Sequence, residues 1–263
     1  MDLGLKDKVV IVTGSSRGIG KTIATNFARE NAKVTICSRN LDNIINVSNK
    51  IKEITNSQIL PIMVNLEKFD DIKNLINKTI EKFGRIDILV NNTGGPPPLK
   101  FLDTSEKEWK KAVDQLLIST INCCHQVIPF MKENGWGRII NMTSIAAKQP
   151  IDNLILSNAI RSGIHGLTKT LSNELAEYGI TVNAVCPGYT LTERVIELAK
   201  AKASKSGKEY QDVISEWEKQ IPIGRLGTTD EIANLVLFYA SEKASYITGN
   251  ITQVDGGYYK SIV

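Results

Sequence analysis

The chain has 263 residues, of which 32 are basic and 28 acidic, so its formal net charge is only +4. This length is sufficient for one large domain with a hydrophobic core. The small charge argues against a nucleic-acid partner, and no apolar run is long enough for a membrane span. Because the polar residues 1–8 do not resemble a signal peptide, and Cys37, Cys123, Cys124 and Cys186 lack metal-binding spacing, we expect a reduced, cytoplasmic protein.

Short β-branched runs alternate with amphipathic stretches along the chain, which is the pattern of βαβ units in a parallel sheet. Strands are predicted at residues 8–13, 33–38, 58–64, 86–91, 137–143, 181–186 and 251–254. Helices are predicted between them at residues 18–31, 41–54, 68–83, 105–133, 157–178 and 229–241. We therefore predict a single α/β domain over residues 1–263, Rossmann-type and doubly wound, with a seven-stranded, mostly parallel sheet and helices on both faces.

The segment from about residue 189 to 224 departs from this alternation, because it is polar, rich in lysine and helical in pattern. It follows the last inner strand, so it should lie at the carboxyl edge of the sheet, where ligands bind in such folds. We predict that this segment is a lid over a substrate pocket. A solvated surface insertion is the alternative.

Residues 13–20 read Thr-Gly-Ser-Ser-Arg-Gly-Ile-Gly and connect the first predicted strand to the first helix. Gly14 permits a tight turn, Gly18 lets the backbone approach a diphosphate, and Gly20 lets the helix pack closely on the sheet. The free N–H groups of the helix N-terminus would face the phosphates. The spacing differs from G-x-G-x-x-G, but its place in the first βα unit predicts a dinucleotide-binding site.

Four further motifs follow in order along the chain, at residues 91–94 (Asn-Asn-Thr-Gly), 138–144, 183–188 with Thr192 after it, and 254–257. Together with the glycine turn they resemble the short-chain dehydrogenase/reductase family over essentially the whole chain. The resemblance implies a bound NAD or NADP, a small-molecule carbonyl or alcohol substrate and, in most members, a homotetramer. Relatives of this kind include 3-oxoacyl thioester reductases and sugar or polyol dehydrogenases.

The choice of nucleotide depends on the end of the second predicted strand, which faces the adenosine ribose in this fold. An acidic residue there favours NAD, whereas this chain has Ser38 and Arg39, with Arg17 in the glycine turn. Since guanidinium groups bind phosphate bidentately, we predict NADP(H), with NAD less favoured. The predicted cofactor-binding residues are Gly14, Ser16, Arg17, Gly18, Ile19, Gly20, Ser38, Arg39, Asn65, Leu66, Asn92, Gly94, Arg161, Pro187, Gly188, Thr190 and Thr192.

The catalytic positions differ from those of the family, whose reductases use an Asn, Ser, Tyr and Lys set. Ser144 aligns with the serine, but Ser157 stands at the tyrosine position and Arg161, one helical turn later, at the lysine position. Leu116 stands where the family has its asparagine. We therefore predict Ser144, Ser157 and Arg161 as the catalytic residues of a non-standard proton-transfer site.

A serine hydroxyl has a shorter reach than a phenol and ionises far less readily, and an arginine does not act as a base. Tyr189 or Tyr210 could supply a phenol instead, although packing or surface roles fit both. His125 fits a core or interface role, and the same choice applies to His165. Three functions remain open. They are an NADP(H)-dependent oxidoreductase, an NADP(H)-binding protein without reductase activity, such as a sensor or non-catalytic subunit, and different chemistry in which Arg161 binds an anionic substrate.

Overall fold

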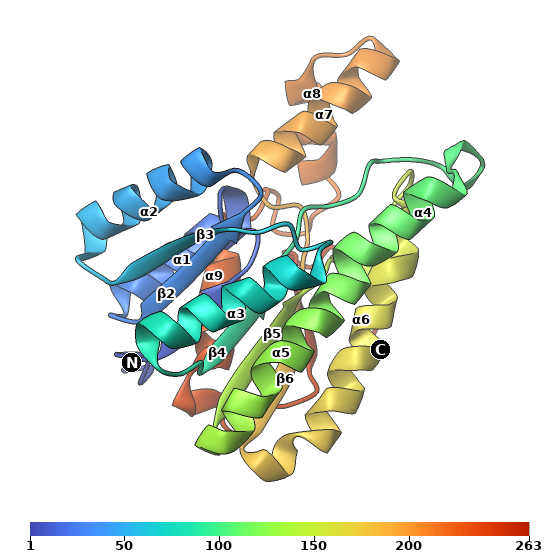
Figure 1. Cartoon of the computed structure of the whole chain (residues 1–263). Helices are drawn as coiled ribbons and strands as arrows, with labels where there is room; N and C mark the ends of the chain where they lie inside the picture. Colours follow the sequence, from blue (N-terminus) through green and yellow to red (C-terminus); the bar gives the residue numbers. More distant parts are fainter. Residues whose placement is uncertain (263) are drawn as a thin grey trace.

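The seven strands of the computed structural model, which describes residues 1–262 without the side chain of residue 205, form one sheet. The strand order is β3-β2-β1-β4-β5-β6-β7, and all paired strands are parallel (Figure 1). This confirms the predicted doubly wound α/β fold. The strands are β1 (Val9–Val12), β2 (Lys33–Ser38), β3 (Ile59–Met63), β4 (Ile88–Asn91), β5 (Gly137–Met142), β6 (Ile180–Pro187) and β7 (Ile251–Val254).

Helices cover both faces of the sheet, with α1, α2 and α9 on one face and α3, α5 and α6 on the other (Figure 1). The remaining helices lie beyond the carboxyl edge of the sheet or extend α5. The α-helices of the described residues are α1 (Gly18–Arg29), α2 (Leu41–Thr55), α3 (Phe69–Phe83), α4 (Glu106–Val113), α5 (Ser119–Asn134), α6 (Ile155–Glu174), α7 (Glu193–Ser206), α8 (Tyr210–Glu218) and α9 (Thr229–Ala240).

The apolar residues of β1 explain why both faces need a helical layer. Side chains alternate along a strand, so Val10 and Val12 belong to the core that includes Phe27 of α1, and Ile11 belongs to the core that includes Leu75 of α3. All of β1 is buried. Continuous apolar strands of this kind are typical of parallel sheets covered on both sides.

The predicted helix at 105–133 is interrupted in the structure. It begins with a capping box, in which Ser105 and Glu108 bond each other's backbone N–H groups. Between α4 and α5, residues Asp114–Ile118 form a π-helical turn. Such turns are rare and are frequently found at functional sites.

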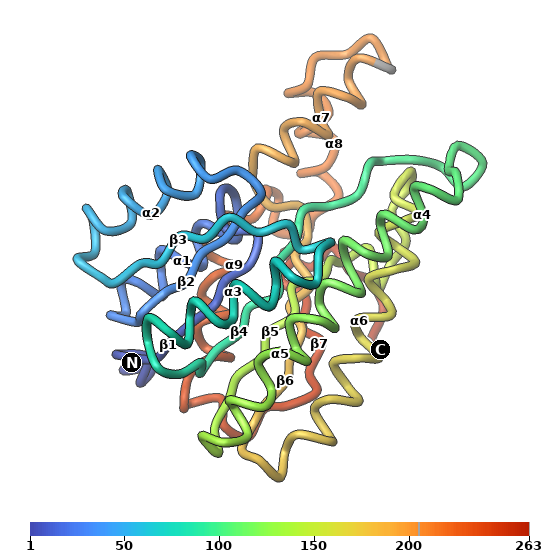
Figure 2. The backbone as a smooth tube through the Cα atoms, in the orientation of Figure 1, coloured from blue at the N-terminus to red at the C-terminus, as the bar shows by residue number. Residues whose placement is uncertain are grey.

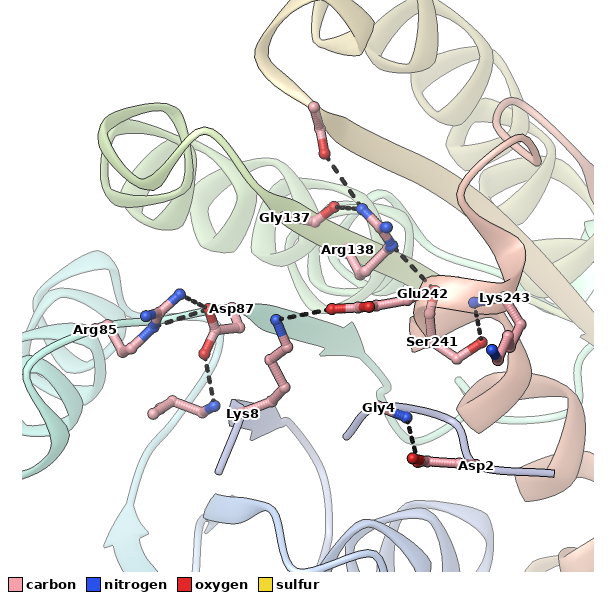
Figure 3. Close-up of polar contacts among 12 residues, drawn as sticks. Asp2, Gly4, Lys8, Arg85, Asp87, Gly137, Arg138, Ser241, Glu242 and Lys243 are labelled. Carbon is pink, nitrogen blue, oxygen red and sulfur yellow. Dashed lines mark hydrogen bonds and ion pairs between the residues drawn. The ribbon is translucent and has the colours of Figure 1, made fainter. Parts of the chain in front are cut away.

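Polar side chains hold together the amino edge of the sheet, on the side away from the strand ends that build the site (Figure 3). Asp87 is fully buried and accepts hydrogen bonds from the backbone N–H of Val9 (2.8 Å) and from Nε of Arg85 (2.9 Å). Arg138 is buried too and donates to the carbonyl oxygens of Gly137 (2.8 Å) and Gly179 (3.2 Å). Asp87 and Arg138 thus both have hydrogen-bond partners, as the burial of charged side chains requires.

The predicted lid segment forms α7 and α8, which pack on each other and project beyond the carboxyl edge of the sheet (Figures 1 and 2). It has its own hydrophobic cluster. The ring of Tyr189 stacks on the ring of Trp217 in this cluster, with 4.8 Å between the ring centroids. This cluster argues against a purely solvated insertion, and movement of the segment as a lid stays a prediction. Its buried members are Ala199, Ala203, Val213, Trp217, Ile221 and Leu226.

Candidate active site

One cleft of about 550 Å³ lies at the carboxyl ends of the strands, and every predicted site residue lines it. The strands bring these residues together, because the segments after β1, β2, β3, β4, β5 and β6 open onto the same edge. They are Gly14, Ser16, Arg17, Gly18, Ile19, Gly20, Ser38, Arg39, Asn65, Leu66, Asn92, Gly94, Ser144, Ser157, Arg161, Pro187, Gly188, Thr190 and Thr192.

The glycine turn has the backbone geometry that its sequence predicts. Gly14 and Gly18 have φ angles of +56° and +54°, which favour glycine. A Cβ atom on Gly14 would lie 2.6 Å from the carbonyl oxygen of Asn92, and one on Gly20 would lie 2.5 Å from that of Gly14. The Asn92 side chain donates to the carbonyl oxygens of Thr13 (3.2 Å) and Gly14 (3.0 Å). Asn92 therefore holds the turn in place at the edge of the cleft.

The end of β2 places Ser38 and Arg39, and no carboxylate, in the lining of the cleft. Ser38 donates its hydroxyl to the carbonyl oxygen of Asn40 (2.8 Å), and Arg39 is exposed. Arg17 already has a partner, since its Nη1 lies 2.7 Å from Oε1 of Glu197 on α7. This hydrogen bond lowers the pKa of the Glu197 carboxyl. The guanidinium groups of Arg17 and Arg39 fit a nucleotide with an additional phosphate. Glu197 of α7 contacts the guanidinium of Arg17.

Ser144, Ser157 and Arg161 come together where β5 ends and α6 begins. Ser144 is half-buried and accepts a hydrogen bond from the backbone N–H of Ala146 (3.1 Å). Ser157 and Arg161 are 7% and 6% exposed. Arg161 Nη1 donates to the carbonyl oxygens of Met142 (3.0 Å) and Thr143 (3.1 Å). Burial lowers the pKa of Arg161 to about 10, so the guanidinium stays charged at neutral pH.

Gln115 lines the cleft, although the sequence did not single it out. It lies in the π-helical turn and donates its Nε2 to the carbonyl oxygen of Gly94 (2.8 Å). Its neighbour Leu116 is fully buried among Ala112, Leu156 and Ile160, so the asparagine position of the family faces the core. The sequence pattern predicts a regular helix here and has no local signal for the π-helical turn.

The two tyrosines that could replace the missing phenol do not line this cleft. Tyr189 packs between Trp217 and Tyr258, whose ring centroid lies 5.4 Å away, and burial raises its pKa well above the usual value. Tyr210 packs on the hydrophobic cluster of α7 and α8. Both therefore have packing roles in this structure.

His165 is the nearest histidine to the site and lies one turn beyond Arg161 on α6. Its Nε2 is 3.1 Å from Oγ1 of Thr143 and 3.5 Å from Sγ of Cys186. Burial, with the charges of Lys148 and Arg161, lowers its pKa to about 4, so the ring is neutral at physiological pH. His125, by contrast, is exposed on α5 and lies outside the core.

A second cavity of about 810 Å³ adjoins the cleft beneath α7 and α8. Leu154, Val195 and Leu198 line both spaces. The aromatic side chains of Tyr189, Trp217 and Tyr258 form part of its wall, together with charged groups at Lys100, Asp103, Asp152 and Lys202. This cavity offers room for a substrate next to the cleft.

Two kinds of feature are not found in the part of the chain that the structure describes. Its cysteine, histidine and acidic side chains form no cluster suited to a metal ion. No helix there combines the length and apolar character needed to cross a membrane.

Comparison with known proteins agrees with the geometry. Residues 14–259 match the family model described as Enoyl-(Acyl carrier protein) reductase. The 3-oxoacyl-[acyl-carrier-protein] reductase FabG of Staphylococcus epidermidis is 36% identical over 254 residues, which are 96% of this chain and 99% of that protein.

Solved structures give the same result. L-sorbose reductase from Gluconobacter frateurii, complexed with NADPH and L-sorbose, matches with a TM-score of 0.96 and 30% identity over 100% of both chains. YwfH, an NADPH-dependent reductase involved in bacilysin biosynthesis, matches with a TM-score of 0.93 and 31% identity over 98% of this chain and 100% of its own. The chain belongs to the short-chain dehydrogenase/reductase family.

Proposed function

We propose that this protein is an NADP(H)-dependent oxidoreductase that acts on a carbonyl/alcohol pair and has a non-standard proton-transfer site. The observation that carries the proposal is the single cleft in which the glycine turn, the end of β2 and Ser144, Ser157 and Arg161 meet. The NADPH complex of the sorbose reductase and the 3-oxoacyl thioester activity named for the Staphylococcus relative support the same class.

The cofactor would lie across the carboxyl edge of the sheet. The turn at residues 14–20 and the N-terminus of α1 would bind the diphosphate through backbone N–H groups, and Arg17 and Arg39 would bind the additional phosphate. Asn65 and Leu66 would border the adenine, and residues 187–192 the nicotinamide. When bound, NADPH supplies the hydride that reduces a carbonyl carbon.

The hydroxyl groups of Ser144 and Ser157 would bind the carbonyl oxygen and stabilise the negative charge that develops on it. Arg161 adds a buried positive charge to the lining of the cleft. Because neither serine is a strong acid, the proton would come from water through the Ser157 hydroxyl. Positioning in the cleft supplies the remaining acceleration.

The cavity beneath α7 and α8 would hold the rest of the substrate, with a 3-oxoacyl thioester as the model compound. By the family resemblance we also expect a homotetramer. The four cysteines are buried and unpaired, which is in keeping with the cytoplasmic location expected from the sequence.

The first test is NADPH oxidation, followed by its absorbance, with 3-oxoacyl thioesters, ketones and keto-sugars. The parent protein should oxidise NADPH with one of these classes. Ser144→Ala should reduce kcat by about 10²-fold or more, because a hydrogen-bond donor to the developing oxyanion is lost. Tight NADPH binding without turnover of any carbonyl would instead favour a nucleotide-binding protein without reductase activity.

A further inference from the structure

Arg161 has one complete hydrogen-bonding edge that no described residue occupies. The guanidinium has five N–H groups, and the two of Nη1 lie toward the carbonyl oxygens of Met142 and Thr143. Among residues 1–262, apart from the side chain of residue 205, neither Nε nor Nη2 has a hydrogen-bond or ion-pair partner. Yet the side chain is 6% exposed and borders the cleft.

The charge of Arg161 is likewise uncompensated within the described residues. Ser157, one helical turn earlier on α6, is neutral. Glu67 and Glu193 line the cleft, but neither forms an ion pair with Arg161. A buried charge without a counter-ion is costly, which indicates that the ligand supplies the anion.

We propose that the free edge of Arg161 binds a carboxylate of the substrate, so that the carbonyl compound is a free oxo acid rather than a 3-oxoacyl thioester. This inference rests on the proposed oxidoreductase function. A planar carboxylate accepts two parallel N–H bonds from such an edge and neutralises the guanidinium.

The spacing of the site limits the kind of oxo acid. Ser157 and Arg161 are one helical turn apart on α6, which separates such side chains by about 5–6 Å at Cβ. A carbonyl oxygen bound at Ser157 and a carboxylate bound at Arg161 must therefore be close in the substrate. This separation fits a 2-oxo or 3-oxo acid.

The reaction balances without a further reactant. Hydride from NADPH forms the new C–H bond at the carbonyl carbon, the carbonyl π bond breaks, and its oxygen takes a proton from water. The products are the 2- or 3-hydroxy acid, NADP⁺ and hydroxide, which the buffer neutralises. The carboxylate is unchanged and serves only to hold the substrate.

The ribose of the cofactor is the competing occupant of the same edge, as the sequence resemblance implies for Arg161. Two ribose hydroxyls would satisfy the N–H groups but would leave the charge without a counter-ion. The two assignments differ in what a conservative substitution weakens. Loss of the free edge of Arg161 would weaken oxo-acid binding if a carboxylate occupies it. It would weaken NADPH binding if the ribose occupies it.

The test compares 2-oxobutanoate and 3-oxobutanoate with their methyl esters, using the parent protein, Arg161→Lys and Arg225→Lys. Lysine keeps the charge and loses the bidentate edge, so kcat/KM for the acids should fall by about 10- to 100-fold more than kcat/KM for the methyl esters. Arg225 forms an exposed ion pair with Glu231, so its lysine variant serves as the matched control. Circular dichroism and thermal unfolding confirm that each variant is folded.

Calorimetric titration of the oxo acids into the complex with NADP⁺ gives a readout that needs no turnover. Saturable binding that Arg161→Lys weakens supports the proposal even if no carbonyl is reduced, in which case only the oxidoreductase function fails. Equal use of acids and esters by the parent, or no acid binding, would overturn it. Weaker NADPH binding by Arg161→Lys with unchanged use of the acids would assign the edge to the ribose.

Discussion

A tyrosine–lysine pair provides both a proton donor and a positive charge. Ser157 and Arg161 do not provide both equally well. Arg161 retains a buried positive charge, with its pKa lowered to about 10 by burial, whereas Ser157 retains only a hydroxyl. Charge stabilisation is thus preserved at these positions, and proton donation is weakened. This explains why we assign the proton to water rather than to a side chain.

His165 makes the stability of the protein depend on pH. Burial, with the charges of Lys148 and Arg161, lowers its pKa to about 4, compared with about 6.5 in an unfolded chain. Between these values the unfolded state binds more protons, so stability rises with pH and is lost as pH falls from about 6.5 to 4. We expect the Tm of His165→Gln to vary less over this range in calorimetric scans. Parallel pH profiles for the two proteins would contradict this assignment.

An ion pair joins α7 to the glycine turn. Glu197 on this helix lies 2.7 Å from Arg17 and 3.8 Å from Arg194, which in turn donates to the carbonyl oxygen of Pro96 (2.9 Å). The Glu197 carboxylate is therefore bound to the guanidinium of Arg17, which we propose as a ligand of the cofactor phosphate. Any movement of α7 as a lid would be coupled to this contact.

The corresponding prediction concerns cofactor affinity. Glu197→Gln removes the competing charge from Arg17 and should tighten NADPH binding by about two- to fivefold, the range of an exposed ion pair. Fluorescence titration measures the affinity, and hydrogen exchange of α7 measures the release of the helix. Glu216→Gln is the matched control, since Glu216 pairs with Lys202 and Lys208 within the same segment. Unchanged or weaker NADPH binding would show that Arg17 is not the phosphate ligand.

The candidate site and the buried polar contacts that stabilise the sheet lie at opposite edges of the sheet. The site lies at the carboxyl edge, and the buried Asp87 joins β1 to the strand beside it at the amino edge. Asp87→Asn should lower the free energy of unfolding by about 1–3 kcal/mol, because the N–H of Val9 and the Arg85 side chain lose a charged acceptor.

Denaturant unfolding measures this loss, and kcat should remain near that of the parent because the substitution is far from the cleft. Asp7→Asn is the control. Asp7 pairs with Lys33 at 3.8 Å with an exposed side chain, and such pairs contribute little. An equal loss of stability in both variants would mean that the burial of Asp87 is not the cause.

The sequence was sufficient to predict the sheet, because β-branched runs such as that of β1 mark buried parallel strands and the glycine turn marks the first βα unit. The residues that line the cleft could also be predicted, because motifs at the carboxyl ends of parallel strands meet at one edge of the sheet. The π-helical turn and Gln115 were missed because that backbone change depends on tertiary packing. The Arg17–Glu197 contact was missed because it joins residues far apart in the chain.

The stacking of Trp217 on Tyr189 links α8 to the strand end at which the cleft is built. The chain has three tryptophans, and this one lies in the wall of the cavity beneath α7 and α8. Displacement of these helices would separate the two rings and change the emission of the indole. The protein thus contains its own optical reporter, by which the position of α7 and α8 can be followed in real time without an added label.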